Sequence, residues 1–297
     1  GGVGDGMAGR AASRPTDATI AAMLVELAPN NPYTLTLKTP LVAAAGCLGY
    51  GVEVARQLGL GTGTAQGLGA LITRTTTLRA RRERVQLLET PAGLIYAGAN
   101  NPGWPLVRKR IAPNWANWDL PVILSVAVDD PGDLGAWLPE LDQLAGVGGV
   151  ELNLAQHAAL NPTHAQQLVG AARASTPLPL LITVPGYAPA LAALAQAAVA
   201  AGADALIVSG ATPAAMRQAD GIVREGMLCG PAIYPLTLRA VAQVAAAVQV
   251  PLLAVGGVRN ADDVGGLQAV GATAVGLGSA LLTDLRTAAR IMAILAR

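Results

Sequence analysis

An imidazole and two amides accompany an apolar run in the segment VELNLAQHAAL, residues 150–160. The continuous apolar pattern at 150–154 is typical of a buried strand, so Asn153, Gln156 and His157 are expected near its carboxyl end. A histidine titrates near neutral pH and can accept a proton, whereas an amide has no useful basicity there. We therefore regard His157 as the candidate catalytic base. The alternative is a solvent-exposed or hydrogen-bonded bystander.

Two later apolar runs end in glycines and lead into segments of helical character. They are PLLAVGGVRNADD (251–263) and GATAVGLGSALL (271–282). Backbone N–H groups beside a helix N-terminus, with no side chains in the way, form an anion site. The pattern predicts a phosphate-bearing cofactor or substrate at Gly256, Gly257, Gly278 and Ser279. The alternative is that these glycines only make tight turns.

A single cation, Arg74, follows the apolar run that begins at Ala70. Enclosing a cation at the end of a buried strand is costly without an anionic partner. We expect Arg74 to face a ligand charge, or else to pair at the rim with Glu83 or Glu89.

Eight short apolar runs must position these residues. Each is followed by glycine, proline or polar residues, as expected of parallel strands that are covered on both faces. They span 41–45, 70–75, 121–127, 150–154, 179–184, 205–209, 251–255 and 273–278, with helix-like segments at 132–145, 188–201, 236–248 and 261–270. This alternation over about 255 residues predicts an α/β fold, a (β/α)₈ TIM barrel. A doubly wound open sheet needs a glycine-rich turn after its first strand, but GLGTGTAQGLG (59–69) precedes a strand.

We expect one barrel domain over residues 20–297, preceded by a small, polar, glycine-rich segment (1–19) that reads as a disordered tail or a cloning remnant. Two connections are longer than ordinary loops, at about 76–119 and 210–235. The first holds an arginine cluster and three of the four tryptophans. Long loops at the carboxyl end are where barrel enzymes keep their active sites.

The net charge of +1 and the 13% of charged residues do not indicate binding to nucleic acid or to anionic lipid. Apolar runs such as 190–209 are interrupted too early to insert into a membrane. Cys47 and Cys229, even with both histidines, lack metal-ligand spacing, so no metal is expected. No signal peptide is recognisable at the start, which favours a cytoplasmic location.

Taken in order, these motifs resemble the class 1 dihydroorotate dehydrogenases, flavoenzymes on a (β/α)₈ barrel. The resemblance is to the 1B type in particular, which works with an electron-transfer partner subunit. It runs from about Leu35 to Ala280 and includes GALITRTTTL, VELNLA, GADALIVS, LCGPAIYPLTLRAV, VGGVRNADD and GATAVGLGSAL. It implies an FMN-dependent oxidoreductase of pyrimidine biosynthesis.

The resemblance also implies which residues bind FMN. Arg74, next to Thr75, stands where the family has a lysine near the pyrimidine edge of the flavin, and Thr183 replaces a lysine of the fifth strand. The remaining cofactor-binding positions are Ala45 and Gly46 beside the flavin, Ser125 and Asn153 facing the ring, and Gly230, Gly256, Gly257, Gly278 and Ser279 around the phosphate.

Substrate-side positions depart from the family pattern. Gln156 stands where the family has the cysteine that removes a proton from dihydroorotate, and Ala158 and Ile95 replace substrate-binding asparagines. A further family asparagine appears as Ser209, and Met227 occupies a glycine position. Tyr96 is a candidate substrate contact or plug of the emptied pocket. Besides His157, Cys47 and Cys229 are possible replacement bases, although small buried cysteines commonly only pack.

The functional hypothesis is an FMN-binding, dihydroorotate dehydrogenase-like oxidoreductase with altered or lost specificity for dihydroorotate. The alternative is a non-catalytic barrel that serves as a structural or regulatory subunit, with 79–118 as a contact surface. A third reading is a barrel that binds another phosphorylated metabolite. Expected partners are a small-molecule substrate near the flavin and either a second copy of the chain or an electron-transfer subunit, with no nucleic acid and no membrane insertion.

Overall fold

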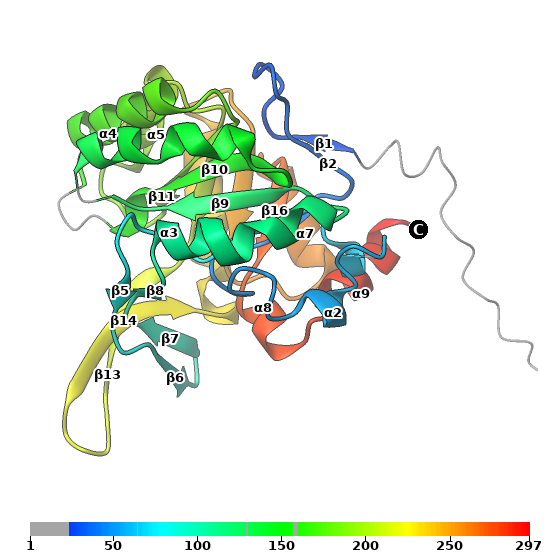
Figure 1. Cartoon of the computed structure of the whole chain (residues 1–297). Helices are drawn as coiled ribbons and strands as arrows, with labels where there is room; N and C mark the ends of the chain where they lie inside the picture. Colours follow the sequence, from blue (N-terminus) through cyan, green and yellow to red (C-terminus); the bar gives the residue numbers. More distant parts are fainter. Residues whose placement is uncertain (1–23, 64, 129, 157–159) are drawn as a thin grey trace, which may run out of the picture.

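A closed barrel of eight parallel strands forms the centre of the computed structural model, which describes residues 24–63, 65–128, 130–156 and 160–297 (Figure 1). Each strand falls within or overlaps one of the eight apolar runs, so the prediction of a (β/α)₈ barrel is confirmed. In their order around the barrel, the strands are β3 (Leu41–Ala43), β4 (Ala70–Ile72), β9 (Val122–Val126), β10 (Val147–Asn153), β11 (Leu180–Pro185), β12 (Ala205–Ser209), β15 (Leu252–Val255) and β16 (Ala274–Leu277).

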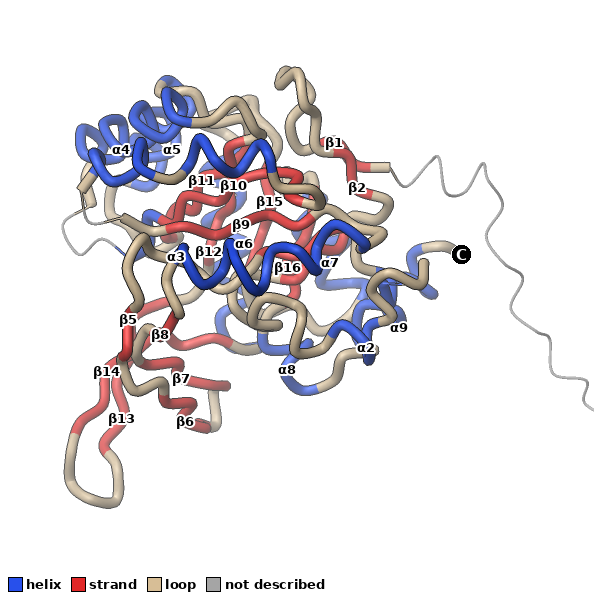
Figure 2. The backbone as a smooth tube through the Cα atoms, viewed as in Figure 1, coloured by secondary structure: helices blue, strands red, loops and turns tan. Residues whose placement is uncertain are grey.

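Helices surround the barrel and bury the outer faces of its strands (Figure 2). They include α2 (Ala55–Leu58), α3 (Trp104–Leu106), α4 (Pro162–Ser175), α5 (Leu191–Ala200), α6 (Tyr234–Ala245), α7 (Ala261–Ala269), α8 (Ser279–Thr283) and α9 (Thr287–Leu295). The expected helices at 188–201, 236–248 and 261–270 correspond to α5, α6 and α7. The segment 132–145 instead forms two 3₁₀ segments, η4 (Pro131–Ala136) and η5 (Leu138–Gln143). Pro139 lacks the N–H that a continuous α-helix would need there.

The interior of the barrel is a separate apolar core, closed at one end by a hairpin. The hairpin strands β1 (Val25–Glu26) and β2 (Thr36–Leu37) pair in antiparallel fashion. Leu27, Leu35 and Leu37 are almost fully buried against inward-facing residues of the barrel strands, such as Leu181 and Leu253. The hairpin therefore seals the amino end and leaves the carboxyl end as the open mouth.

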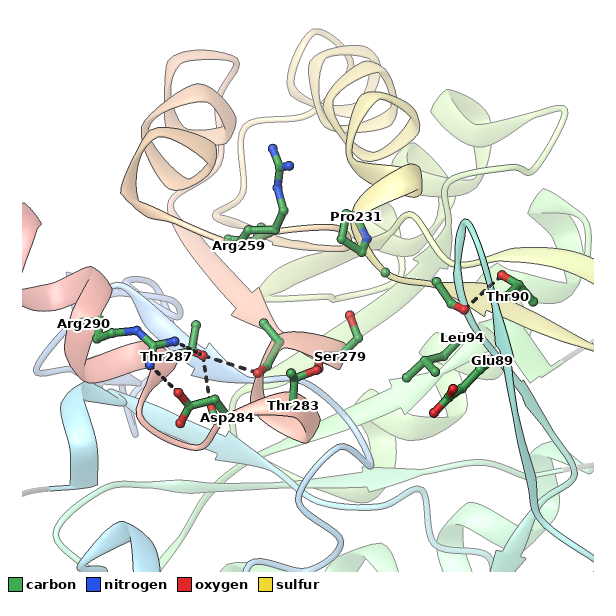
Figure 3. A pocket seen from close by; sticks show the side chains of 14 residues that line it. Glu89, Thr90, Leu94, Pro231, Arg259, Ser279, Thr283, Asp284, Thr287 and Arg290 are labelled. Carbon is green, nitrogen blue, oxygen red and sulfur yellow. Dashed lines mark hydrogen bonds and ion pairs between the residues drawn. The ribbon is translucent and has the colours of Figure 1, made fainter.

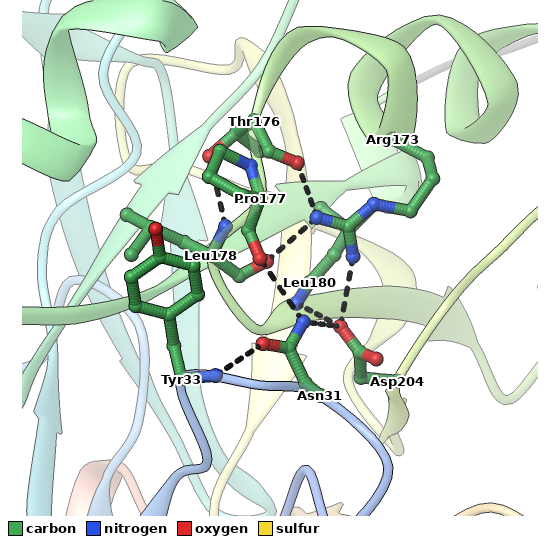
Figure 4. Close-up of polar contacts among 8 residues, drawn as sticks. All are labelled: Asn31, Tyr33, Arg173, Thr176, Pro177, Leu178, Leu180 and Asp204. Atoms are coloured by element: carbon green, nitrogen blue, oxygen red, sulfur yellow. Dashed lines mark hydrogen bonds and ion pairs between the residues drawn. The ribbon is translucent and has the colours of Figure 1, made fainter.

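A polar network fastens this hairpin to the barrel (Figure 4). Asp204 Oδ2 accepts hydrogen bonds from Arg173 Nη1 at 2.9 Å, from Asn31 Nδ2 at 3.0 Å and from the Leu180 amide at 2.8 Å. Arg173 also donates to the Leu178 carbonyl at 2.9 Å. One carboxylate thus joins α4, the starts of β11 and β12, and the segment between β1 and β2.

The two long connections fold together as one antiparallel sheet. Strands β6 (Gln86–Thr90) and β7 (Gly93–Ala97) come from the first connection, and β13 (Thr212–Arg217) and β14 (Val223–Cys229) from the second. The sheet order is β13-β14-β7-β6, with Ile95 opposite Leu228. A short pair, β5 (Arg81–Arg82) and β8 (Asn100–Asn101), lies nearby, and the β13–β14 hairpin projects away from the barrel (Figure 1).

The tryptophans of the first connection do not form an exposed contact surface, contrary to part of the subunit hypothesis. Trp104 is 3% exposed and Trp115 is fully buried. Their indole N–H groups donate to Glu140 Oε2 at 2.9 Å and to the Tyr50 carbonyl at 3.1 Å. Trp118 is partly buried against the same core. The segments η2 (Val107–Ile111) and η3 (Ala112–Asn117) turn these rings inward, where aromatic burial stabilises the fold.

Across the described ranges, no helix has both the length and the apolar character needed to cross a bilayer.

Candidate functional site

A cluster of small polar side chains lies at the carboxyl ends of adjacent barrel strands. Thr75, just beyond β4, has its hydroxyl 2.9 Å from Ser125 Oγ on β9. Asn153, the last residue of β10, donates from Nδ2 to Thr75 Oγ1 at 3.2 Å and accepts from the Ala155 amide through Oδ1 at 3.1 Å. Both ends of the Asn153 amide are therefore fixed. The structure brings together three residues that the resemblance assigned to the cofactor.

Below this cluster lies a buried carboxyl group that the sequence analysis did not single out. Glu151 on β10 is 1% exposed, sits opposite Ser125 in the parallel pairing with β9, and accepts a hydrogen bond at Oε1 from the Thr183 hydroxyl. Burial raises the pKa of Glu151, against the smaller lowering effect of the Ser125 and Thr183 hydroxyls. In the sequence, Glu151 is recognisable only as a single acidic residue inside an otherwise apolar strand.

Arg74 lies beside this cluster, half-buried, with its backbone N–H donating to the Gly49 carbonyl at 2.6 Å. Among the described residues, no ion pair joins Arg74 to Glu83 or Glu89, and Glu83 Oε2 instead accepts from the Ala99 amide at 2.8 Å. Burial raises the pKa of Tyr50, while the nearby charge of Arg74 acts to lower it. The expected pairing with Glu83 or Glu89 is therefore not formed, and the charge of Arg74 lies close enough to Tyr50 to affect its pKa.

Packing explains the paired glycines after β15. A Cβ atom at Gly256 would lie 2.4 Å from Thr237 Oγ1, and one at Gly257 would lie 2.5 Å from the Tyr234 amide nitrogen. Both glycines have positive φ, +144° and +78°. The close approach of α6 and this backbone conformation account for both residues without a ligand, as the tight-turn alternative expects.

Two other glycines lie beside open space. At Gly46, where φ is +79°, no atom lies within 4 Å of an added Cβ, and at Gly278 the nearest is Ala44 Cβ at 3.8 Å. The neighbouring Ala45 is exposed. Since no protein atom crowds Gly46 or Gly278, a bound group could approach the backbone closely at these two turns.

A pocket of about 460 Å³ lies between the β6–β7 hairpin and the segment that carries α8 and α9 (Figure 3). Its lining includes Gly230 and Ser279, both predicted to bind phosphate, but not Arg74, Ser125, Asn153 or Thr183. Pockets of a few hundred Å³ are typical of small-molecule sites. The predicted cofactor residues therefore fall into two groups, one along this pocket and one at the barrel mouth.

The substrate-side residues are only partly assembled in the structure. Ser209 ends β12 and is half-buried, whereas Tyr96 on β7 is 37% exposed and lies opposite Met227. Ile95 is 3% exposed. Gln156 ends the short 3₁₀ segment η6 (Leu154–Gln156).

The candidate base His157 and the neighbouring Ala158 lie outside the described residues. The catalytic role of His157 therefore stays a prediction.

The two cysteine thiols are poor candidates for the catalytic base, because both stay protonated near neutral pH. Cys47 Sγ donates to the Leu277 carbonyl at 3.4 Å, and burial raises the pKa of Cys47 to about 12. Cys229 Sγ donates to the Leu94 carbonyl at 3.3 Å, and burial raises its pKa as well. Thiols that stay protonated cannot act as bases near neutral pH. In the parts of the chain that the structure describes, no group of three histidine, cysteine or acidic side chains could hold a metal ion.

Comparison with known proteins gives consistent matches over nearly the whole barrel. The family model described as dihydroorotate dehydrogenase matches residues 29–297. The chain is 34% identical over 276 residues to the dihydroorotate dehydrogenase B (NAD(+)) catalytic subunit of Desulforudis audaxviator, covering 87% of this chain and 88% of that protein. The protein of the same name from Enterococcus faecalis is 32% identical over 267 residues, with 84% of each chain covered. The one from Geotalea daltonii is 33% identical over 275 residues, covering 87% of this chain and 88% of its own.

Proposed function

The chain belongs to the dihydroorotate dehydrogenase family of flavin-dependent oxidoreductases, and from this premise we propose that it binds FMN at the barrel mouth and oxidises a substrate other than dihydroorotate, or oxidises dihydroorotate poorly. The observation that carries the proposal is the hydrogen-bonded cluster of Thr75, Ser125 and Asn153 at the mouth. The free space beside the backbone at Gly46 and Gly278 supports it, because a planar ring can lie against the backbone only where no side chain is in the way.

The residues present fit an FMN group. Donors and acceptors of the mouth cluster would bind the polar edge of the ring, and the pocket lined by Gly230 and Ser279 would hold the phosphate. When bound, FMN supplies a hydride acceptor. Arg74 would place a fixed positive charge at the edge of the ring, which stabilises a reduced, anionic flavin. Its planar guanidinium group fills a different volume from the ammonium group of a lysine.

The substrate side supports altered specificity. Gln156 supplies no base where the family has a cysteine, and neither Cys47 nor Cys229 is ionised near neutral pH. Loss of a general base lowers rates by about 10² to 10⁴. Ile95 offers no hydrogen bond where the family has an asparagine, and a site that loses such polar partners loses discrimination for a polar substrate.

The absorption spectrum of the purified chain tests the proposal. We expect a flavin spectrum as purified or after incubation with FMN, and slow or no bleaching when dihydroorotate is added without oxygen. A chain that stays colourless after incubation with FMN would overturn FMN binding. Rapid bleaching with formation of orotate would overturn altered specificity.

Two substitutions test which residue accepts the proton. His157→Ala should abolish any substrate-driven flavin reduction if His157 is the base, and unchanged reduction would make it a bystander. Gln156→Cys should raise the rate of reduction by dihydroorotate, by up to about 10²-fold, if only the base is missing. No gain from Gln156→Cys would place the defect in substrate binding.

We also propose that electrons leave the flavin to a partner subunit. The relatives bear the name catalytic subunit, which implies companion chains for those proteins. Flavin that is reduced by dithionite and reoxidised faster by a co-expressed partner than by oxygen alone would support this. Equal rates with and without the partner would argue against it.

A further inference from the structure

Glu151 is the only ionisable side chain within the eight barrel strands as the structure describes them. It is 1% exposed and lies on the same face of β10 as Asn153, two residues further along, whose amide bonds to Thr75 at the mouth. A carboxyl group costs free energy when it is buried in ionised form without a cation.

Among the described residues, the side chains that act on the pKa of the Glu151 carboxyl group through hydrogen bonding are two neutral hydroxyls, those of Thr183 and Ser125. Thr183 on β11 donates to Oε1, and Ser125 on β9 lies close enough to lower the pKa. Oε2 has no hydrogen-bond partner among the described residues. No charged side chain in the described ranges contributes to the pKa of Glu151, and Arg74, the cation nearest this cluster in sequence, acts on Tyr50 instead.

The protonation of this carboxyl group determines the direction of the hydrogen bonds above it. An ionised Glu151 would accept the Ser125 proton, so Thr75 would have to donate its own proton to Ser125. An uncharged Glu151 can donate its proton to Ser125, the hydroxyl opposite it in the pairing of β10 with β9, and Ser125 then donates to Thr75 across their 2.9 Å contact. Thr75 would accept from both Ser125 and Asn153, and its own proton would be free.

We propose that Glu151 is a positioning residue that stays uncharged in the folded chain and, by donating its proton to Ser125, leaves the Thr75 hydroxyl free to donate to the ligand at the barrel mouth. Thr75 is half-buried at this mouth, so its proton can reach a bound acceptor. In its FMN-binding part this inference rests on the proposed function. The protonation of Glu151 itself does not.

Infrared difference spectroscopy of the full chain without added ligand tests the protonation. At pH 7 we expect the carbonyl stretch of a protonated carboxylic acid in the wild type and its loss in Glu151→Gln. The matched control Glu225→Gln, at an exposed glutamate of β14, should keep the band. Absence of the band in the wild type, or its persistence in Glu151→Gln, would overturn the proposal, whether or not FMN binds.

Titration with FMN at pH 7 tests the positioning role. Glu151→Gln, whose amide also donates, should keep the Kd within about threefold of the wild-type value. Glu151→Leu has a similar volume but cannot donate to Ser125, so its Kd should rise about tenfold or more. An unchanged Kd in Glu151→Leu, or an equal rise in both variants, would overturn this role. If the wild type does not bind FMN, the proposed function fails, and the infrared result alone decides the state of Glu151.

Discussion

Thr75 and Ser125 lie 2.9 Å apart, hydroxyl to hydroxyl, where the continuation of β4 meets the end of β9. This contact joins two adjacent barrel strands at the mouth and connects Asn153 above with the region of Glu151 below. It makes the cluster a single hydrogen-bonded unit in which a change at one residue alters what the others can donate.

Replacing Thr75 with Val should therefore weaken FMN binding. The substitution keeps the shape but removes the hydroxyl that contacts Asn153 Nδ2 and Ser125 and that would donate to the ligand, and losing such a hydrogen bond costs about 1–3 kcal/mol. We expect an increase in Kd of about 10-fold, measured by quenching of flavin fluorescence. Thr62→Val, at an exposed threonine, should bind FMN normally, and an equal affinity in Thr75→Val would show that the cluster does not contact the flavin.

A side chain at Gly278 should block the cofactor. In the ligand-free chain the added Cβ meets only Ala44 Cβ at 3.8 Å, so Gly278→Val should fold and melt at nearly the wild-type temperature. The added methyl groups would fill the space next to the backbone, and FMN absorbance should be lost. The control Gly265→Val, on the exposed side of α7 with no atom within 4 Å, should retain FMN. Full FMN occupancy in Gly278→Val would show that the flavin does not approach this turn.

Glu151 should make the stability of the ligand-free chain depend on pH. The pKa of Glu151 is raised in the folded chain, so between the ordinary carboxyl pKa of 4.5 and the native value the folded state binds more protons than the unfolded state. Its contribution is fully present below pH 4.5 and is lost as the pH rises toward the native pKa of Glu151. In urea unfolding, the free energy of unfolding of Glu151→Gln relative to that of the wild type should increase as the pH rises over this window. A constant difference at all pH values would contradict the raised pKa.

Thr183→Lys should ionise Glu151. The Thr183 hydroxyl already contacts the carboxyl group, so an ammonium group at the same position would favour the charged form and lower the pKa of Glu151. We expect the infrared band of the protonated acid to disappear at pH 7. Thr183→Val supplies no charge and should keep the band, and a band that survives in Thr183→Lys would mean that the lysine turns away from Glu151.

Asp204→Asn should destabilise the whole chain. The variant weakens a partly buried carboxylate that accepts from Arg173, Asn31 and the Leu180 amide, and it leaves the guanidinium without its counter-charge. We expect a loss of about 2–4 kcal/mol in the free energy of unfolding, measured with urea. Asp220→Asn breaks an exposed pair with Arg224 and should change stability little. Similar small effects of both variants would show that the network of Figure 4 contributes little.

The residue pattern along the chain is enough to predict the barrel. Runs such as ALIVS at 205–209 are apolar on both faces, and only strands covered inside and outside need that pattern. Eight such runs with helices between them leave few other arrangements. The α-helical expectation for 132–145 was wrong because Pro139, inside an otherwise suitable segment, removes a backbone donor.

The sequence by itself determined the strands, the helices α5 to α7 and the positions of the glycine turns, because each follows from local pattern and backbone freedom. Only the tertiary structure decided which residues meet. It paired Ile95 with Leu228 from two distant loops, crowded Gly257 with Tyr234, and placed Glu151 between two hydroxyls from neighbouring strands. The physical reason is that these contacts join residues far apart along the chain, so neither strand periodicity nor turn chemistry carries information about them, and closure of the barrel creates them.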